Sequence, residues 1–169
     1  LESVQQAQKR CGDLELDLVV NNAGLLTNET LSDIDDSAVT RILDQFTTNS
    51  LGPLLVTSVF KPYLKRGSKV AMITSRMGSI DDNTSGSRYG YRMSKAALNI
   101  AAMSLSHDLR SDDIAVGVFH PGYVRTEMTG YSGFLDPDES AAMLMERIQL
   151  LSLSTSGQFF HADGSSLPW

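Results

Sequence analysis

Three polar side chains of the sequence could meet at one point and move a proton. Ser75 ends a mostly apolar, β-branched run over residues 69–75, which is typical of a buried strand. Tyr91 and Lys95 follow a loop rich in Gly, Asp, Asn and Ser, and in a helix their spacing places them on one face. Because ligands of open α/β sheets bind beyond the carboxyl ends of the strands, we expect the three side chains to lie at such a site.

A serine, a tyrosine and a lysine suit the proton-transfer half of a carbonyl reduction. A free tyrosine keeps its proton to about pH 10, and an ammonium a few ångströms away lowers that pKa because it favours the phenolate. Ser75 could hydrogen-bond a carbonyl or hydroxyl while Tyr91 gives or takes the proton, and a cofactor would supply the hydride. On these residues alone, an ordinary exposed helix pair is the simpler interpretation of Tyr91 and Lys95.

Composition limits the class of protein. The chain has 169 residues, enough for one domain over residues 1–169 with a sizeable core. Its net charge is -6 and its Lys and Arg residues form no clusters, which argues against nucleic acid or a membrane as a partner. The single cysteine, Cys11, fits a reducing compartment, and no apolar run approaches the roughly 20 residues of a membrane span. We therefore expect a cytoplasmic enzyme.

The elements that must position the site alternate along the chain. Apolar and alternating runs predict strands over residues 14–20, 69–75, 114–119 and 157–161. Helical periodicity predicts helices over residues 1–11, 37–66 with a break near Gly52-Pro53, 89–110 and 137–152. This alternation predicts an α/β fold with a parallel sheet covered on both faces.

Two further stretches could complete the site. Asn21-Asn22-Ala23-Gly24 follows the first predicted strand, where small residues let the backbone approach a ligand, although a plain turn explains them equally well. Asn49 is a polar residue within an apolar helical stripe. A buried Asn must find partners, so its side chain is expected to bond either the kinked backbone beside it or a water in the site.

The third predicted strand runs into Pro121-Gly122, which stops the strand and permits a sharp turn. Residues 123–135 then predict a flexible flap, whose Tyr and Phe side chains suit an apolar or aromatic carbonyl compound. No metal site is expected, because the three histidines lack Cys, His or carboxylate partners at ligand spacing. These histidines are His107, His120 and His161.

These motifs, in this order, resemble the short-chain dehydrogenase/reductase family over nearly all of the chain. Ser-Arg-Met-Gly-Ser, Tyr-Arg-Met-Ser-Lys and the terminal Asp-Gly-x-x-Leu-Pro-Trp look most like its C-factor-type and sniffer-type carbonyl reductases. The resemblance implies a Rossmann-type doubly wound sheet. It also implies that Tyr91 is the general acid/base, that Lys95 lowers its pKa and holds the nicotinamide ribose, and that Ser75 polarises the carbonyl. Asn49 would anchor a water that links Lys95 to solvent.

The resemblance further implies NAD or NADP as cofactor and a small carbonyl or alcohol as substrate. The cofactor-binding residues would be Asn22, Ala23, Gly24, Tyr91, Lys95, Pro121, Gly122, Val124 and Thr126. The family's usual homodimer or homotetramer would join through helices near residues 40–66 and 89–110. The alanines expected to permit close packing there are Ala96, Ala97, Ala101 and Ala102.

One part of the family pattern is missing: no Gly-x-x-x-Gly-x-Gly precedes Asn21. The resemblance places roughly 60 further residues upstream, so the chain is expected to be N-terminally truncated and to hold strands 4–7 of the usual sheet. The strand over 14–20 would then be an unpaired, aggregation-prone edge, and the 169 residues alone would bind cofactor weakly and be inactive. The alternative is a non-catalytic, C-factor-like signalling or protein-binding module. The four site residues favour the enzyme, because a retired site has no chemical reason to keep them.

Overall fold

The computed structural model describes residues 2–12 and 14–169, which form a four-stranded sheet in the order β1-β2-β3-β4. All neighbouring strands are parallel, which confirms the predicted α/β class. The strands are β1 (Leu16–Asn21), β2 (Leu64–Ile73), β3 (Ala115–His120) and β4 (Phe159–His161). Their carboxyl ends therefore lie at one edge of the sheet, and that edge is where the predicted site residues follow.

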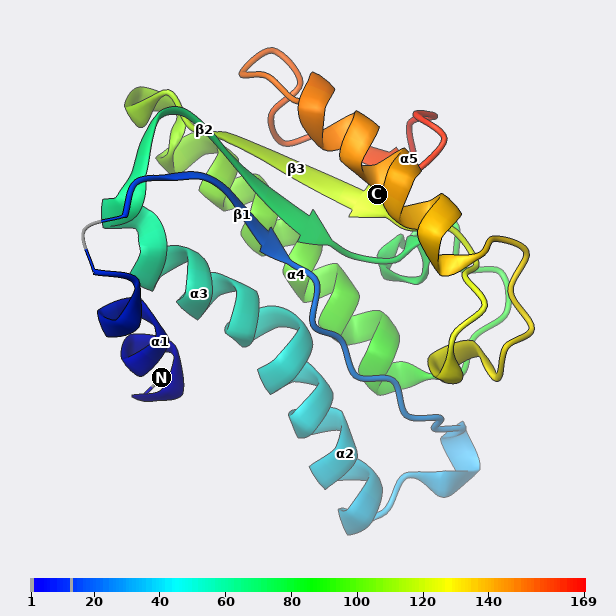
Figure 1. Ribbon diagram of the computed structural model, residues 1–169. Coiled ribbons are helices and arrows are strands. Elements are labelled where there is room, and N and C mark those ends of the chain that lie inside the picture. The colour runs from blue at the N-terminus through cyan, green and yellow to red at the C-terminus, as the bar shows by residue number, and fades with distance from the viewer. Residues whose placement is uncertain (1, 13) are drawn as a thin grey trace.

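Helices cover both faces of the sheet, as expected for a doubly wound fold. Figure 1 shows α3 and α4 on one face and α5 on the other. The helices are α1 (Glu2–Cys11), α2 (Asp36–Phe46), α3 (Gly52–Phe60), α4 (Tyr89–Asp108) and α5 (Pro137–Leu150). A π-helical turn (Thr47–Leu51) joins α2 to α3, and single 3-10 turns occupy Leu31–Asp33, Lys61–Tyr63, Arg76–Gly78, Arg110–Asp112 and Glu127–Thr129.

The core lies in two layers, one on each face of the sheet. Every residue of β3 is buried, which explains why this strand is continuously apolar rather than alternating. Val116 and Val118 of β3 pack with Leu98 and other residues of α4. Phe119, on the opposite face, packs against Ile148 at the end of α5. The two layers clamp the middle strands and hold their carboxyl ends in place.

A single helix was predicted over residues 37–66 with a break near Gly52-Pro53. The predicted break is confirmed, and the predicted end is wrong. α3 stops at Phe60, and β2 begins at Leu64, which pairs with Leu16 of β1. The π-helical turn lies directly before Pro53. Because proline has no N–H to offer the carbonyl four residues back, the α-helical ladder is interrupted there and the turn widens.

The sheet has an open edge at β1. Within residues 2–12 and 14–169, β1 pairs with β2 alone, and Val20 is 44% exposed, so the predicted unpaired edge is confirmed. One packing prediction is wrong: Ala102 is buried in the core against the sheet rather than at an outer helix surface. No helix in the described part of the chain is long and apolar enough to span a membrane.

Candidate active site

The three residues singled out first meet at the carboxyl end of β2. Ser75 lies just beyond the strand, and its Oγ accepts a hydrogen bond from the Met77 backbone N–H (3.1 Å) as it caps a short turn. Tyr91 and Lys95 come from successive turns at the start of α4, and only 7% and 3% of their surfaces are exposed. The Ser75 side chain is also close enough to the Tyr91 phenol to lower its pKa. The expected juxtaposition is therefore present, while the roles of the residues stay predictions.

Lys95 is a buried ammonium held by the end of a strand. Its Nζ donates to the Ile73 carbonyl oxygen of β2 (3.0 Å) and lies 5.8 Å from the centre of the Tyr91 ring. Burial lowers the pKa of Lys95 to about 8, because the charged form loses its hydration. Since Ile73 takes one of the three N–H donors, Lys95 can still donate to a ligand.

The pKa of Tyr91 differs from the expectation. Burial raises the pKa above its ordinary value, and the nearby Ser75 hydroxyl and the charge of Arg88 oppose this only in part. A net lowering of the phenol pKa is therefore absent in the chain by itself, because the desolvation of the phenolate outweighs the neighbours that favour it. The role of Lys95 toward the phenol stays a prediction.

Asn49 bonds the loop after β1 and α4 rather than the kinked backbone beside it. It lies in the π-helical turn and is fully buried. Its Nδ2 donates to the Leu25 carbonyl oxygen (2.8 Å) and to Ser94 Oγ (2.9 Å), and its Oδ1 accepts from the Leu25 N–H (2.7 Å). Asn49 therefore ties the loop after β1 to α4, which correctly places it beside Lys95 but gives it a structural task.

A second buried polar pair, Glu29 and Gln45, holds the start of α4 in place, and it was not predicted from the sequence. Glu29 is fully buried, and its Oε2 accepts from the Gly90 N–H (3.2 Å) at the helix N-terminus, where a carboxylate is favoured. Gln45 Nε2 donates to Glu29 Oε1 (3.0 Å). Gln45 lies one turn before Asn49, so two polar residues on the buried side of one helix were the signal that could have revealed this anchor.

Two glycines let the site elements approach each other. A methyl group on Gly78 would lie 2.7 Å from the Lys95 carbonyl carbon, which no side chain tolerates, so the turn after Ser75 packs directly on α4. A methyl group on Gly90 would collide with Gln45 and Ile42 of α2. Neither requirement is visible in the sequence, because the colliding atoms belong to other elements.

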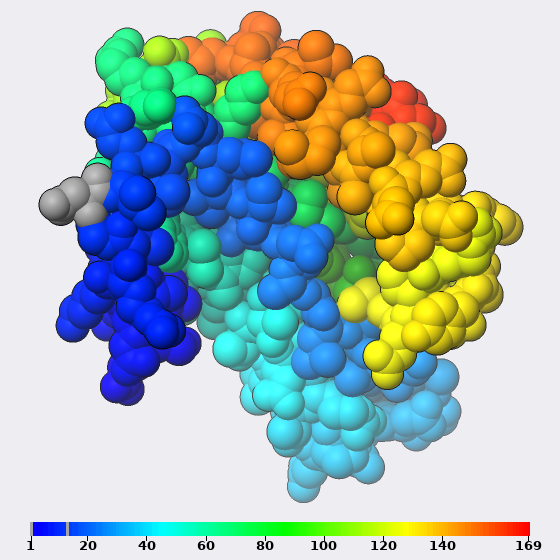
Figure 2. Space-filling model, viewed as in Figure 1, coloured from blue at the N-terminus to red at the C-terminus, as the bar shows by residue number. Residues whose placement is uncertain are grey.

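The predicted cofactor residues line the same edge of the sheet from two sides. Asn22, Ala23 and Gly24 are exposed in the loop after β1. Pro121, Gly122, Val124 and Thr126 lead from β3 into the flap, residues 123–135. The flap crosses toward that loop: a methyl on Gly24 would lie 3.9 Å from Met128 Cε and 3.7 Å from Lys95 Nζ. Figure 2 shows the surface hollowed between the blue loop and the yellow flap, with green atoms at its bottom.

The flap is more ordered than a flexible segment. The Phe134 N–H donates to the Tyr123 carbonyl oxygen (2.7 Å), and Arg125 Nε donates to Asp136 Oδ1 (2.9 Å), so its two ends are tied together. Four side chains of the flap are nevertheless exposed although they are large and apolar: Tyr123, Met128, Tyr131 and Phe134. Such side chains can cover an apolar ligand lying in the hollow.

Two histidines lie next to each other at the end of the sheet. The His120 and His161 rings meet edge to face with centres 5.1 Å apart, and burial lowers the pKa of His120 to about 3. Asp163 pairs with His161 Nδ1 (3.1 Å). In the described part of the chain, no three His, Cys, Asp or Glu residues lie close enough together to bind a metal ion.

Comparison with known proteins identifies relatives of the whole arrangement. Residues 2–133 match the family model described as short chain dehydrogenase. A 1-hydroxy-2-glutathionyl-2-methyl-3-butene dehydrogenase of Rhodococcus sp. (strain AD45) is 38% identical over 99% of this chain and 76% of its own length. The C-signal of Myxococcus xanthus is 43% identical over 91% of this chain and 93% of its own length.

Solved structures agree with these sequence matches. The carbonyl reductase Sniffer of D. melanogaster superposes with a TM-score of 0.88 and 31% identity, over 99% of this chain and 72% of that one. An NADPH-bound carbonyl reductase from chicken fatty liver superposes with a TM-score of 0.85 and 28% identity, over 99% of this chain and 73% of that one.

Proposed function

The chain belongs to the short-chain dehydrogenase family, and on that premise we propose that it is an NAD(P)-dependent oxidoreductase that interconverts a carbonyl and a hydroxyl group. The observation that carries the proposal is the meeting of Ser75, Tyr91 and Lys95 beyond the end of β2. The similarity to NADPH-bound and NADP-bound reductases supports a nicotinamide nucleotide as cofactor.

The residues present fit the nicotinamide end of such a cofactor. Lys95 has donors to spare, and the surface beside it is open because Gly24 carries no side chain. Lys95 and Tyr91 would hold the nicotinamide ribose, and the residues at the ends of β1 and β3 would line the rest. These residues are Asn22, Ala23, Gly24, Pro121, Gly122, Val124 and Thr126. When bound, the nucleotide gives or takes the hydride.

The chain's own groups handle the proton. Because burial keeps the pKa of Tyr91 high, the phenol is protonated at neutral pH and can donate to a carbonyl oxygen during reduction. Ser75, whose hydroxyl lies near the phenol, orients the same oxygen. Lys95, with a pKa of about 8, is still mostly charged at pH 7 and stabilises the phenolate that remains. Asn49 acts as a positioning residue, since it holds the Leu25 backbone.

Within residues 2–12 and 14–169, no glycine-rich turn precedes β1 to hold a pyrophosphate, so the 169 residues alone should bind the nucleotide weakly and turn over slowly or not at all.

We also propose that the protein is cytoplasmic and that it forms a homodimer or homotetramer through the helices near residues 40–66 and 89–110. Exposed apolar side chains on these helices would be covered by a second copy: Leu43, Leu51, Leu54, Met93 and Ile100.

A second candidate function is a non-catalytic signalling or protein-binding module. The similarity to the C-signal, which extends over nearly the whole length of that protein, favours it. The intact proton-transfer site favours the enzyme, because Asn49, Ser75, Tyr91 and Lys95 are all present and buried together. Nucleotide binding discriminates between the two candidates.

The test combines binding and turnover. NADH and NADPH binding are measured by fluorescence on the 169 residues alone and with any natural upstream sequence restored, and oxidation of the saturating nucleotide is followed in both with a panel of aldehydes and ketones. Tyr91→Phe should still bind the nucleotide but lose about 10²–10⁴-fold in kcat. Tyr89→Phe is the matched control, because Tyr89 lies at the same helix end without facing Lys95 and should leave kcat unchanged. If the protein with its upstream sequence restored binds neither nucleotide and turns over no substrate, the enzyme is refuted and the module is favoured.

A further inference from the structure

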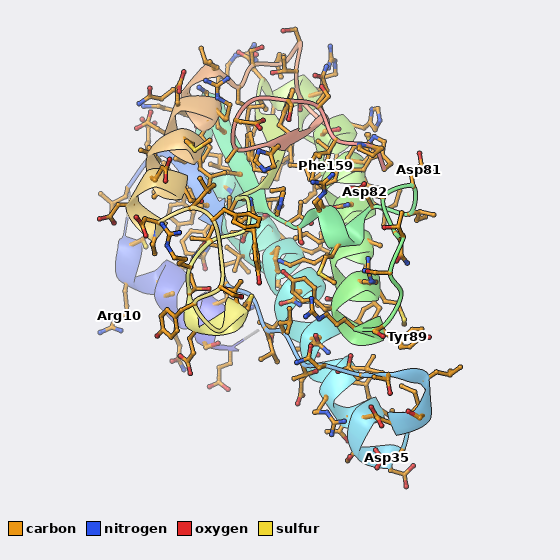
Figure 3. The ribbon with its side chains drawn as sticks, turned by 90° about the vertical axis from the view of Figure 1, so that its right-hand side faces the viewer. Arg10, Asp35, Asp81, Asp82, Tyr89 and Phe159 are labelled. Atoms are coloured by element: carbon orange, nitrogen blue, oxygen red, sulfur yellow. The ribbon has the colours of Figure 1, made fainter. Side chains whose placement is uncertain are left out.

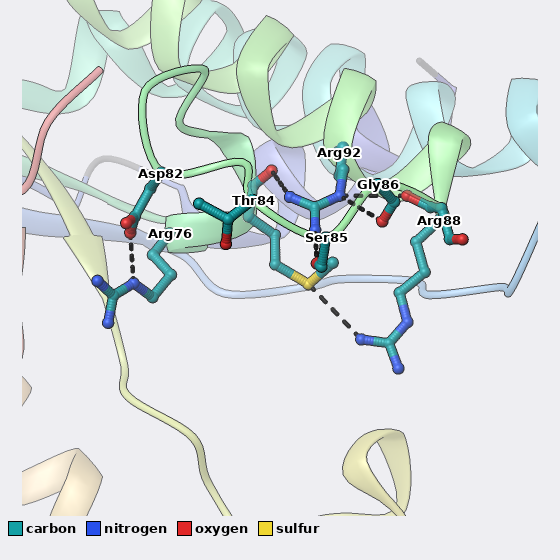
Figure 4. Close-up of a pocket in the computed structure, with 9 residues that line it drawn as sticks. Arg76, Asp82, Thr84, Ser85, Gly86, Arg88 and Arg92 are labelled. Atoms are coloured by element: carbon teal, nitrogen blue, oxygen red, sulfur yellow. Dashed lines mark hydrogen bonds and ion pairs between the residues drawn. The ribbon is translucent and has the colours of Figure 1, made fainter.

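A cavity of about 580 Å³ lies along the loop that connects Ser75 to Tyr91. Figure 3 marks this loop by Asp81 and Asp82, with Tyr89 where it enters α4. Figure 4 shows Arg76 and Asp82 at one end of the cavity, Arg88 at the other, and Arg92 between them. The proposed reaction uses none of these four side chains.

The cavity wall carries more positive than negative charge. Its one acid, Asp82, is engaged by Arg76, whose Nε lies 2.6 Å from Asp82 Oδ2. Arg88 and Arg92 form no ion pair with any acid among residues 2–12 and 14–169. The pKa of Arg92 is lowered by partial burial and by the charge of Arg88, so the two guanidinium groups are near one another. An uncompensated pair of this kind attracts an anion.

The two arginines have different tasks. Arg92 is committed to the protein, because its Nε donates to the Gly86 and Ser87 carbonyl oxygens (3.2 and 3.1 Å) and its Nη2 donates to Ser85 Oγ (2.9 Å). It braces the wall. The Arg88 guanidinium has one strong hydrogen bond to the protein, from its Nε to Asn28 Oδ1 (3.0 Å).

The outer edge of Arg88 has no strong acceptor within the described chain. Its Nη1 approaches only the Met77 sulfur, at 3.8 Å, and a thioether is a weak acceptor. The guanidinium fork is therefore available at the exposed end of the cavity. A planar fork of this kind matches a carboxylate or phosphate through two parallel hydrogen bonds.

The backbone that holds Arg88 in this place is conformationally strained. Ser87 and Arg88 have φ angles of 55° and 54°, a left-handed conformation that side chains rarely adopt. The Arg88 N–H donates to the Glu29 carbonyl oxygen (2.7 Å), which secures the strained residue. Strain of this kind persists where the surrounding structure enforces it, often at ligand sites.

The cavity adjoins the reacting groups. Met77, in its wall, is the residue whose N–H is bound by Ser75. Arg88 is close enough to Tyr91 for its charge to lower the pKa of the phenol. Met77 and Arg88 therefore connect the cavity wall to the two residues that would hold a substrate carbonyl.

We propose that this cavity binds an oxyanion of the substrate, with Arg88 as its ligand and Arg92 as the positioning residue, so that the site selects carbonyl compounds and alcohols that carry a carboxylate or phosphate. The inference rests on the proposed function and names the substrate class for the same site. The apolar flap side chains would cover the remainder of such a substrate, which makes an aromatic aldehyde with a charged end a suitable probe.

The test uses the protein with any natural upstream sequence restored and compares three aldehydes that differ at one end: 4-formylbenzoate, 4-formylphenyl phosphate and the neutral methyl 4-formylbenzoate. The wild type should prefer the two anions, and Arg88→Met should lose about 10- to 100-fold in kcat/KM for them, mainly through KM, because a hydrogen-bonded charge is lost. The methyl ester should be unaffected. Arg66→Met is the matched control: it removes one exposed positive charge from the opposite end of β2 and should change no rate. The anionic aldehyde with the higher kcat/KM shows whether the site binds a carboxylate or a phosphate.

A binding measurement separates this inference from the proposed function. Calorimetric titration with 4-(hydroxymethyl)benzoate and its methyl ester reports recognition of the anion without turnover. If no aldehyde is reduced but the benzoate binds and Arg88→Met abolishes binding, the anion site at Arg88 stands while the enzyme proposal, and with it the substrate selection, fails. If the methyl ester is reduced as well as the anions, or if Arg88→Met changes neither binding nor KM, the inference is overturned while the enzyme stands. Should Arg88→Met fail to fold, Arg88→Gln and the wild-type preference for anion over ester decide.

Discussion

Replacing Lys95 by methionine should stabilise the folded chain while it removes activity. Lys95 is 3% exposed and carries a charge that has lost its hydration, and its one protein acceptor is the Ile73 carbonyl oxygen. A methionine of similar length fills the same space without a charge. Stability and function therefore oppose each other at this position, as is common at active sites.

The size of the effect follows from the pKa of Lys95. Its fall from 10.5 to about 8 means that keeping the buried group charged costs about 3 kcal/mol at neutral pH. Lys95→Met also removes the hydrogen bond to Ile73, which costs about 1 kcal/mol. The variant should therefore gain about 2 kcal/mol in the free energy of unfolding at pH 7.

The pH dependence gives the sharper assay. Between about pH 8 and 10.5 the folded chain has lost the Lys95 proton while the unfolded chain keeps it, so the stability of the wild type rises with pH in that window. Urea unfolding followed by circular dichroism should show the wild type gaining about 2 kcal/mol relative to Lys95→Met between pH 7 and 9.5. Because both proteins contain every other titrating group, their difference isolates Lys95.

Lys61→Met is the control, since it removes an ammonium that is half exposed and paired with Asp112. Its unfolding free energy should stay within about 1 kcal/mol of the wild type, as for an exposed ion pair. Parallel stability curves for the wild type and Lys95→Met from pH 7 to 9.5 would refute the reasoning, because the lysine would then be hydrated in the folded chain. An active Lys95→Met variant would instead refute its role in proton transfer.

Two further predictions concern the packing around the site. Gly78→Ala should destabilise the fold by about 1–3 kcal/mol and lower kcat, because the added methyl would lie 2.7 Å from the Lys95 backbone; thermal melts and turnover check it, and an unchanged melt would contradict the close packing. Asn49→Ala should cost about 2–4 kcal/mol, because it leaves the Leu25 N–H and carbonyl unpaired. Hydrogen exchange should then quicken at the Leu25 amide, and unchanged protection would count against this role.

Continuous apolar runs and residue spacing determined much of the fold in advance. β3 was predicted within one residue at each end, because a strand buried on both faces leaves an unbroken apolar run. The start of α5 was predicted because Asp136 and Pro137 form a characteristic helix beginning. The end of α3 was missed by six residues, since Pro62 and the pairing of Leu64 with β1 override the helical pattern.

The sequence by itself also determined which residues stand at the site, because Tyr91 and Lys95 are one helical turn apart and Ser75 ends a strand. Only the tertiary structure decided what surrounds them. Asn49 binds a loop 24 residues away, and Glu29 reaches the start of α4 from 61 residues away. Such contacts depend on how elements pack, whereas periodicity encodes neighbours within one element.

The same distinction explains the tyrosine and the arginines. The direction in which the pKa of Tyr91 moves depends on how much water the whole fold removes from the phenol, and no local spacing reports that. Arg88 and Arg92 look like ordinary charges of an exposed helix start in the sequence. Folding draws the loop after Ser75 against α4, so that the two guanidinium groups face one cavity beside the proton-transfer groups. The candidate catalytic residues were thus predictable from local order, and the surface that would choose the substrate exists only because distant segments pack together.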